Sequence, residues 1–173
     1  MKAIFKFMRG RKGQSIVEIS LITPLLLIAL VIPADFGVAF FVANITGNAV
    51  REGARIGAAR WKSGGTSDNR DFNLQDAADV RDAVVARLPA YLQNRSVTVK
   101  FYEDTVANCL EVIEVTASGT YSYYLYQILR LVGATVPNNT TISRTTQIPY
   151  LYQPYNNDTR CTSTSVDQTY SNV

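Results

Sequence analysis

An apolar segment near the N-terminus constrains this chain more than any other feature. Residues 19–34 (ISLITPLLLIALVIPA) carry no charge, and the apolar character resumes after Asp35 and continues to Ala43. A helix that spans a membrane needs about 20 predominantly apolar residues. The stretch from Ile16 to Ala43 meets this need, with only Glu18 and Asp35 as charged interruptions. We therefore expect one membrane-spanning helix near the N-terminus.

The charges around this segment predict its orientation. Five of the 17 basic side chains precede Gly13 and no acid does, which leaves 12 basic and 14 acidic side chains in the rest of the chain. Because basic residues stay on the cytoplasmic side, we expect a cytoplasmic N-terminus and an extracytoplasmic chain after about residue 45. The basic excess belongs to this leader, so it does not predict a nucleic-acid partner.

The composition argues against most familiar enzyme chemistry. The chain has no histidine, which removes His general bases, His-activated nucleophiles and the commonest metal ligand. Two cysteines are too few for a structural zinc site of four Cys and His ligands. The Ser, Lys, Asp and Tyr residues show no catalytic constellation. We therefore expect no catalytic residues, no metal site, no cofactor and no enzymatic activity.

Two simple interpretations of the apolar segment leave one residue unexplained. A cleaved secretory signal also has a basic start and an apolar core, but neither Ala34 nor Ala39 lies in a small-residue cleavage context. An uncleaved membrane anchor is the other interpretation. Neither accounts for Glu18, an acid set among the first residues of the apolar run.

The surroundings of Glu18 resemble the cleavage site of a type IV prepilin. A basic stretch ends in Gly13, and Glu18 is the fifth residue after it. Over residues 13–60 the chain resembles the TadE-like family more closely than a major pilin. The features that carry this resemblance are GQSIVE at 13–18, the Pro-Leu-Leu-Leu run from residue 24, Asp-Phe-Gly at 35–37, and AVREGAR at 49–55.

The resemblance implies a minor pilin, or pseudopilin, of the tight-adherence (Tad/Flp) pilus system. It implies cleavage after Gly13 by a prepilin peptidase, which would leave Gln14 as the first residue. It also implies that Glu18 neutralises the N-terminal amine of a neighbouring subunit and fixes the subunit register. The implied partners are the peptidase, other pilins and the pilus assembly platform. The implied location is the inner membrane with a single pass, with incorporation into an extracellular pilus left open.

Asp35 predicts a second contact on the same helix. It lies 17 residues after Glu18, which is roughly 260° around a helix, so the two acids do not share a face. We expect Asp35 to lie at the outer membrane interface, or to contact the assembly platform or another pilin. Pro24 and Pro33 favour kinks in this helix.

Small residues four apart predict close packing along the helix after the membrane segment. The spacing of four holds for Ala39, Ala43 and Gly47, for Gly53 and Gly57, and for Ala54 and Ala58. Two partners remain open for this surface. One is the helix of another pilin, and the other is the globular domain of the same chain.

The rest of the chain predicts a small α+β head outside the membrane. We divide the chain into a leader (1–13), a transmembrane and spine helix (14–60), a head (61–152) and a polar, loosely ordered tail (153–173). The head begins with a loop at 61–73 and a helix capped by Asn73, on which Asp76, Asp79 and Asp82 form a solvated face rather than a cation site. Alternating residues predict antiparallel strands at 96–103, 112–123 and 140–152, with a short helix or hairpin excursion at 124–133.

Cysteines and tyrosines leave further alternatives in the head. In an oxidising compartment Cys109 and Cys161 would form a disulfide that ties down the tail, and two free thiols are the alternative. The tyrosines around residues 121–126 fit a half-buried strand, although tyrosine-rich surfaces also bind partners or glycans.

Two functions from different classes follow. The first is a TadE-like minor pilin, of which a secretion-system pseudopilin is a close variant. The second is an uncleaved, signal-anchored binding or adhesion protein that does not depend on Glu18.

Overall fold

The computed structural model describes residues 12–59, 74–104, 110–124, 137–151 and 166–173, together with 127, 129, 130, 133 and 135. Three expectations lie outside these residues. They are the conformation of the leader up to residue 11, the loop at 61–73, and the pairing of Cys109 with Cys161.

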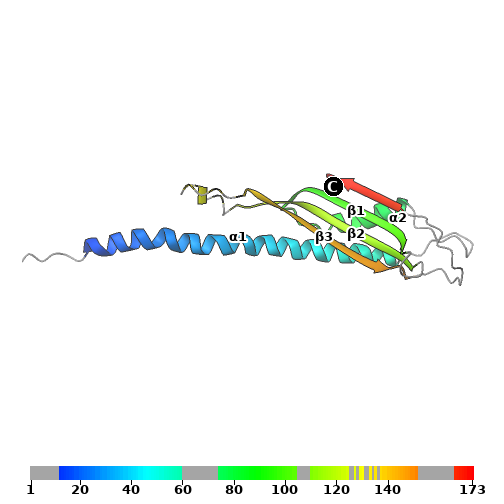
Figure 1. Cartoon of the computed structure of the whole chain (residues 1–173), viewed down its shortest axis with the longest axis horizontal. Coiled ribbons are helices and arrows are strands. Elements are labelled where there is room, and N and C mark those ends of the chain that lie inside the picture. Colours follow the sequence, from blue (N-terminus) through cyan, green and yellow to red (C-terminus); the bar gives the residue numbers. More distant parts are fainter. Residues whose placement is uncertain are drawn as a thin grey trace, which may run out of the picture.

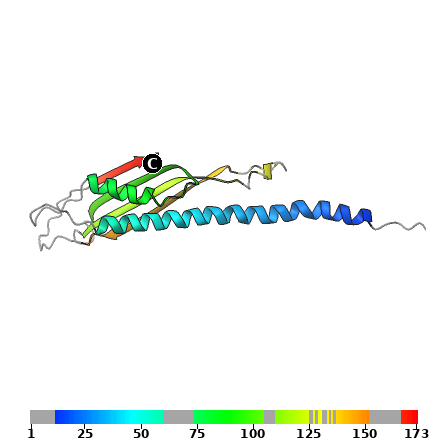
Figure 2. The same ribbon diagram turned by 180° about the vertical axis from the view of Figure 1, so that it is seen from behind.

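One long helix runs through the molecule. Helix α1, Lys12–Ala58, has 47 residues, which corresponds to about 70 Å. It contains Pro24 and Pro33 and continues through both of them. Figures 1 and 2 show that the first half of α1 projects beyond the head, whereas the sheet lies along its second half. The molecule is therefore a spine that carries a head at one end.

The head consists of a second helix and an antiparallel sheet of four strands. The elements are α2 (Leu74–Val85), β1 (Leu92–Asp104), β2 (Leu110–Ser122), β3 (Asn139–Pro149) and β4 (Val166–Ser171). The strand order is β3-β2-β1-β4, and every neighbouring pair is antiparallel. This arrangement confirms the expected fold class, an α+β head on a long N-terminal helix.

Both helices pack on one face of the sheet. Helix α1 contacts β2 and β3, and α2 contacts α1, β1 and β4. Residues alternate strictly along β2, so that Ile113, Val115 and Ala117 are buried under the helices while their neighbours face away. The helices contribute Val50 and Val84, among others, to the same core.

The C-terminal tail corrects one expectation. We expected residues 153–173 to be loosely ordered, but Val166–Ser171 forms β4. It pairs with β1 from Phe101↔Val166 to Ser96↔Ser171. The side chains of this edge strand alternate between half-buried and exposed, and most are polar, so the apolar pattern that identifies a strand is weak here.

The connection between β2 and β3 extends beyond the end of the sheet. Its described residues include a short 3₁₀ turn around Gln127, Leu129 and Arg130. In Figure 1 this part lies beside α1, on the side toward the N-terminal half of the helix. The head thus reaches further down α1 than the four strands do.

Candidate membrane and assembly site on the long helix

Large apolar side chains are exposed along the first half of α1. Ile16, Leu21, Leu25 and Leu30 are each between 69% and 73% exposed. About 20 such residues match the hydrocarbon thickness of a bilayer, near 30 Å. The helix is long and apolar enough to cross a membrane, and little of its most apolar window is buried. This one N-terminal helix therefore has the character of a single-pass membrane anchor.

The residues of the cleavage-site pattern lie at the far end of this anchor. Gly13 and Gln14 are in the first turn of α1, and Glu18 follows one turn later with an exposed side chain. Polar hydroxyls in the anchor are satisfied within the helix. Ser20 Oγ donates to the Val17 carbonyl at 2.9 Å, and Thr23 Oγ1 donates to the Ile19 carbonyl at 2.7 Å. Such internal bonds suit a helix without water around it.

Asp35 marks the point where the head meets the helix. Its side chain is only 2% exposed, and Oδ1 accepts a hydrogen bond from the backbone N–H of Tyr124 at 3.4 Å. The hydroxyl of Tyr121 is a second hydrogen-bonding partner of this carboxylate. Burial, and next the negative charge of Asp35, raises the pKa of Tyr121 above its usual value near 10.

Aromatic rings complete this contact. Phe36 lies 6.0 Å from the ring of Tyr123 at 58°, and Tyr123 meets Tyr121 edge-on at 5.6 Å. We call Asp35, Phe36, Tyr121, Tyr123 and Tyr124 the tyrosine clasp. Within this chain the carboxylate of Asp35 is buried under the end of β2. Its expected place at the outer membrane interface, or in contact with the platform or another pilin, stays a prediction.

The small residues after the clasp pack against the chain's own head. A Cβ atom at Gly53 would collide with the side chain of Val84 on α2. A Cβ at Gly57 would collide with that of Ile113 on β2. At Gly47 the added atom would make ordinary contact, at 3.9 Å, with the side chain of Arg144 on β3. Of the two partners left open by the sequence, the structure places the head on this surface.

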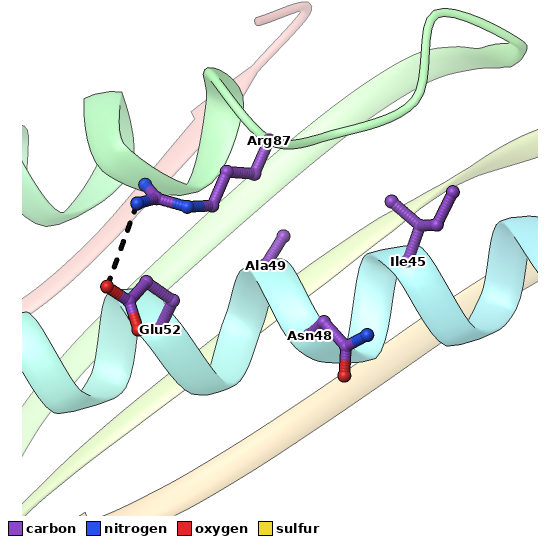
Figure 3. Close-up of a pocket in the computed structure, with 5 residues that line it drawn as sticks. All are labelled: Ile45, Asn48, Ala49, Glu52 and Arg87. Atoms are coloured by element: carbon purple, nitrogen blue, oxygen red, sulfur yellow. Dashed lines mark ion pairs between the residues drawn. The ribbon is translucent and has the colours of Figure 1, made fainter.

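An ion pair joins α1 to the turn after α2. Glu52 Oε1 lies 3.6 Å from Arg87 Nη2, at the rim of a hollow of about 310 Å³ (Figure 3). Ile45, Asn48 and Ala49 line the rest of this hollow. Sequence reasoning did not identify Arg87, because no local pattern links it to a residue on α1.

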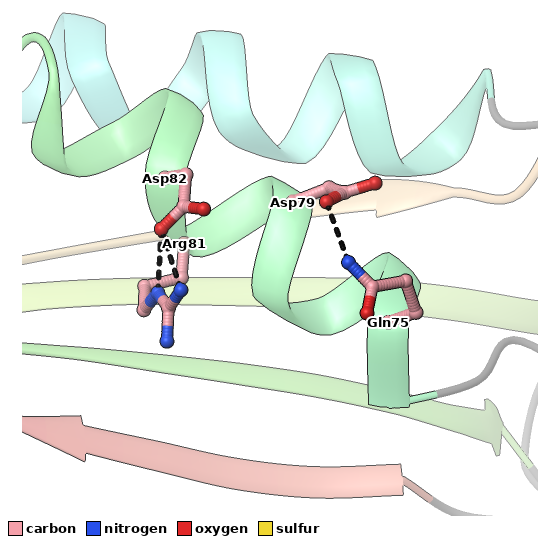
Figure 4. Close-up of polar contacts among 4 residues, drawn as sticks. All are labelled: Gln75, Asp79, Arg81 and Asp82. Carbon is pink, nitrogen blue, oxygen red and sulfur yellow. Dashed lines mark hydrogen bonds and ion pairs between the residues drawn. The ribbon is translucent and has the colours of Figure 1, made fainter.

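The aspartates of α2 make local contacts. Figure 4 shows that Asp79 accepts a hydrogen bond from Gln75 Nε2 at 3.1 Å, and that Asp82 binds the guanidinium of Arg81 at 2.7 Å. Within the described residues, no three His, Cys, Asp or Glu side chains are placed to hold a metal ion. Arg81 also stacks over the ring of Tyr170 at 4.6 Å, which joins α2 to β4.

Comparison with known proteins gives one family match, which covers the anchor and the next part of α1. The family model described as TadE-like protein matches residues 13–55. This match begins at the glycine of the cleavage-site pattern and ends within the part of α1 that the head covers. Searches of curated proteins and of solved structures give no significant match. Over residues 13–55 of its 173 residues, the chain is therefore similar to TadE-like proteins.

Proposed function

We propose that this chain is a minor pilin or pseudopilin that a prepilin peptidase cleaves after Gly13, and that it acts in the assembly or structure of a Tad-type pilus used for surface adherence. One observation carries the proposal. A single helix of the TadE-like family is covered by a head along one half and bare along the other. A bare apolar half is what a subunit needs if it first sits in a bilayer and then packs among other helices.

The position of Gly13 supports the cleavage step. Gly13 ends the basic leader and lies in the first turn of α1, and the apolar segment begins at Ile16. The positive-inside rule puts this junction at the cytoplasmic surface. A peptidase acting there would release the leader and leave a free amine on Gln14.

Glu18 supports a role in subunit register. It lies four positions after Gln14, a rise of about 6 Å along the helix. A carboxylate within an apolar segment is costly in a bilayer, at roughly 2.5–3.5 kcal/mol on insertion scales. An amine on a neighbouring subunit would offset this cost, and a buried pair of this kind strongly penalises a shifted register.

The same reasoning supports a structural role rather than an enzymatic one. The partners in this proposal are the prepilin peptidase, other pilins, the assembly platform and the membrane. The N-terminus is cytoplasmic and the head lies outside. The absence of histidine from the sequence narrows the possible catalytic chemistry.

The mature N-terminus tests the proposal directly. The full chain is expressed with and without its cognate prepilin peptidase, extracted from membranes, and analysed by intact mass and N-terminal peptide sequencing. We expect a peptidase-dependent start at Gln14 that is lost in Gly13→Ala. The control is Gly37→Ala, which changes a glycine of the same helix with open space around it.

Other start sites would overturn the proposal in different ways. A start at Met1 in the presence of active peptidase would favour an uncleaved, signal-anchored binding or adhesion protein. A start near Asp35 or Phe40 would mean a secreted head without a spine. A start at Gln14 together with normal pilus incorporation of Glu18→Gln would remove Glu18 from the mechanism but leave the processing intact.

A further inference from the structure

The outer face of the sheet carries an ordered array of hydroxyl groups. On β2 the buried residues alternate with Glu114, Thr116 and Ser118, whose side chains face away from the helices. From this face we infer that the head has a binding surface for a neutral polysaccharide, which no part of the proposed pilus role requires.

The strand register aligns like residues across all four strands. One row holds only serine and the next holds only threonine. In the order β3-β2-β1-β4, the serine row is Ser143, Ser118, Ser96 and Ser171, and the threonine row is Thr145, Thr116, Thr98 and Thr169. We call these eight residues the hydroxyl face.

Sheet geometry makes the hydroxyl face a regular grid. Neighbouring strands lie about 4.8 Å apart, and residues two apart along a strand lie about 6.7 Å apart. The hydroxyls also hold one another in place. Ser96 Oγ lies 2.7 Å from Ser118 Oγ, and two threonine pairs, Thr116–Thr145 and Thr98–Thr169, lie 2.9 and 3.1 Å apart. Each hydroxyl has one donor and two acceptor sites, so these contacts leave capacity for a ligand.

A third row of polar and charged side chains lies beside the hydroxyl face. In the same strand order it contains Gln147, Glu114, Lys100 and Asp167. Lys100 Nζ lies 3.6 Å from Asp167 Oδ2, and Gln147 donates to the hydroxyl of Tyr102 at 3.2 Å. A hollow of about 340 Å³ lies here, lined by Lys100, Phe101, Tyr102, Glu114, Val166 and Asp167.

The hydrogen-bonding groups of the hydroxyl face favour a polysaccharide as its ligand. Serine and threonine hydroxyls both donate and accept hydrogen bonds, as sugar hydroxyls do. A polysaccharide can therefore bind to them without leaving a hydroxyl group unpaired. The half-buried Tyr102 adds a phenolic hydroxyl beside the third row. Protein interfaces have apolar and aromatic centres, whereas the two central rows here are hydroxyls alone. The three rows carry one lysine and two acids, which disfavours an anionic polymer such as a nucleic acid.

The test uses the full chain in detergent micelles. Retention is measured on microcrystalline cellulose, chitin and cross-linked dextran, and affinity is measured by calorimetry with cellohexaose and chitohexaose. We expect binding to at least one of these polysaccharides. We also expect the double variant Thr98→Val and Thr116→Val to lower that affinity about tenfold or more, because each change removes hydroxyl contacts of roughly 1 kcal/mol.

A matched variant separates surface chemistry from folding. Thr146 lies on β3 but faces the helix side of the sheet, opposite Val115. Thr146→Val is expected to bind like the unmodified chain. If the double variant fails to fold, as judged by circular dichroism, Ser118→Ala with Tyr102→Phe replaces it.

Three outcomes would overturn the inference. They are no retention on any of the polysaccharides, equal loss of binding in Thr146→Val, and unchanged binding in the folded surface variants. Cleavage at Gly13 is scored separately by mass, so failure of glycan binding leaves the pilin proposal standing, and failure of cleavage leaves the binding result standing.

Discussion

The two halves of α1 belong to one continuous helix, yet they have opposite surroundings. Before Asp35 the side chains are large and exposed, as at Leu21 and Leu25. After Ala43 the buried positions are mostly small, as at Ala49, Gly53 and Gly57. The contrast teaches a size rule for this helix: exposed positions in its first half carry large apolar side chains, whereas the positions covered by the head carry mostly small ones. Large residues supply apolar surface to a bilayer, whereas small residues let a sheet approach the helix axis.

The largest expected effect comes from reversing this size rule on the covered half. Gly57→Leu forces a side chain into Ile113 and Val80, and overpacking of this kind costs about 3 kcal/mol. The matched control is Gly37→Leu, since nothing lies within 4 Å of a Cβ at Gly37. We expect Gly37→Leu to leave head stability within about 1 kcal/mol of the unmodified chain. Urea unfolding followed by circular dichroism in detergent measures both. Equal stability of the two variants would show that the size rule does not govern the covered half.

The second effect concerns the boundary between the halves. Asp35→Ala removes the acceptor of the buried Tyr121 hydroxyl and of the part-buried Tyr124 N–H, which costs about 2 kcal/mol. Glu18→Gln, on the uncovered half, is expected to leave unfolding of the head unchanged and to impair incorporation into pili. The comparison uses urea unfolding for stability and the amount of the chain in sheared pili for assembly. A head equally destabilised by Glu18→Gln would remove the distinction between the two acids.

Sequence patterns predicted the parts of this molecule that depend on local periodicity. The long apolar run predicted α1, and an apolar stripe after Asn73 predicted α2. Alternation of apolar and polar residues predicted three of the four strands. The family resemblance rested on residues close together in the chain, and the family model matches the same segment. Local spacing is sufficient to predict these features because each of them lies within a single helix or strand.

The features that sequence reasoning missed depend on which elements meet. Asp35 and Tyr124 are 89 positions apart, and no spacing rule connects them. The aligned serine and threonine rows require the register between strands, which alternation along one strand does not specify. Strand β4 was missed because an edge strand with one covered face shows few apolar residues. The pairing of Cys109 with Cys161 stays a prediction.

The third effect uses pH to test the clasp. Because the pKa of Tyr121 is raised on folding, the folded chain holds this proton more tightly than the unfolded chain does. The contribution of the tyrosine clasp to the free energy of unfolding is therefore fully present below about pH 10. It is lost as the pH rises through the pKa of Tyr121 in the folded chain. We expect Tyr121→Phe to show a shallower loss of stability as the pH rises above about pH 10. Unfolding curves at several pH values measure the slope. An unchanged slope would mean that Tyr121 ionises no later in the folded chain than in the unfolded one.

The smallest effect tests whether charge, rather than close packing, attaches the head to α1. Glu52 and Arg87 remain partly exposed at 3.6 Å, so solvent screens their attraction. We expect Glu52→Gln to destabilise the head by about 0.5 kcal/mol, with the difference vanishing in high salt. A double-mutant cycle with Arg87→Gln, read from urea unfolding at low and high salt, isolates the pair. A coupling as large as the cost of Gly57→Leu would mean that this ion pair, and not the small residues of α1, chiefly determines how the head sits on the spine.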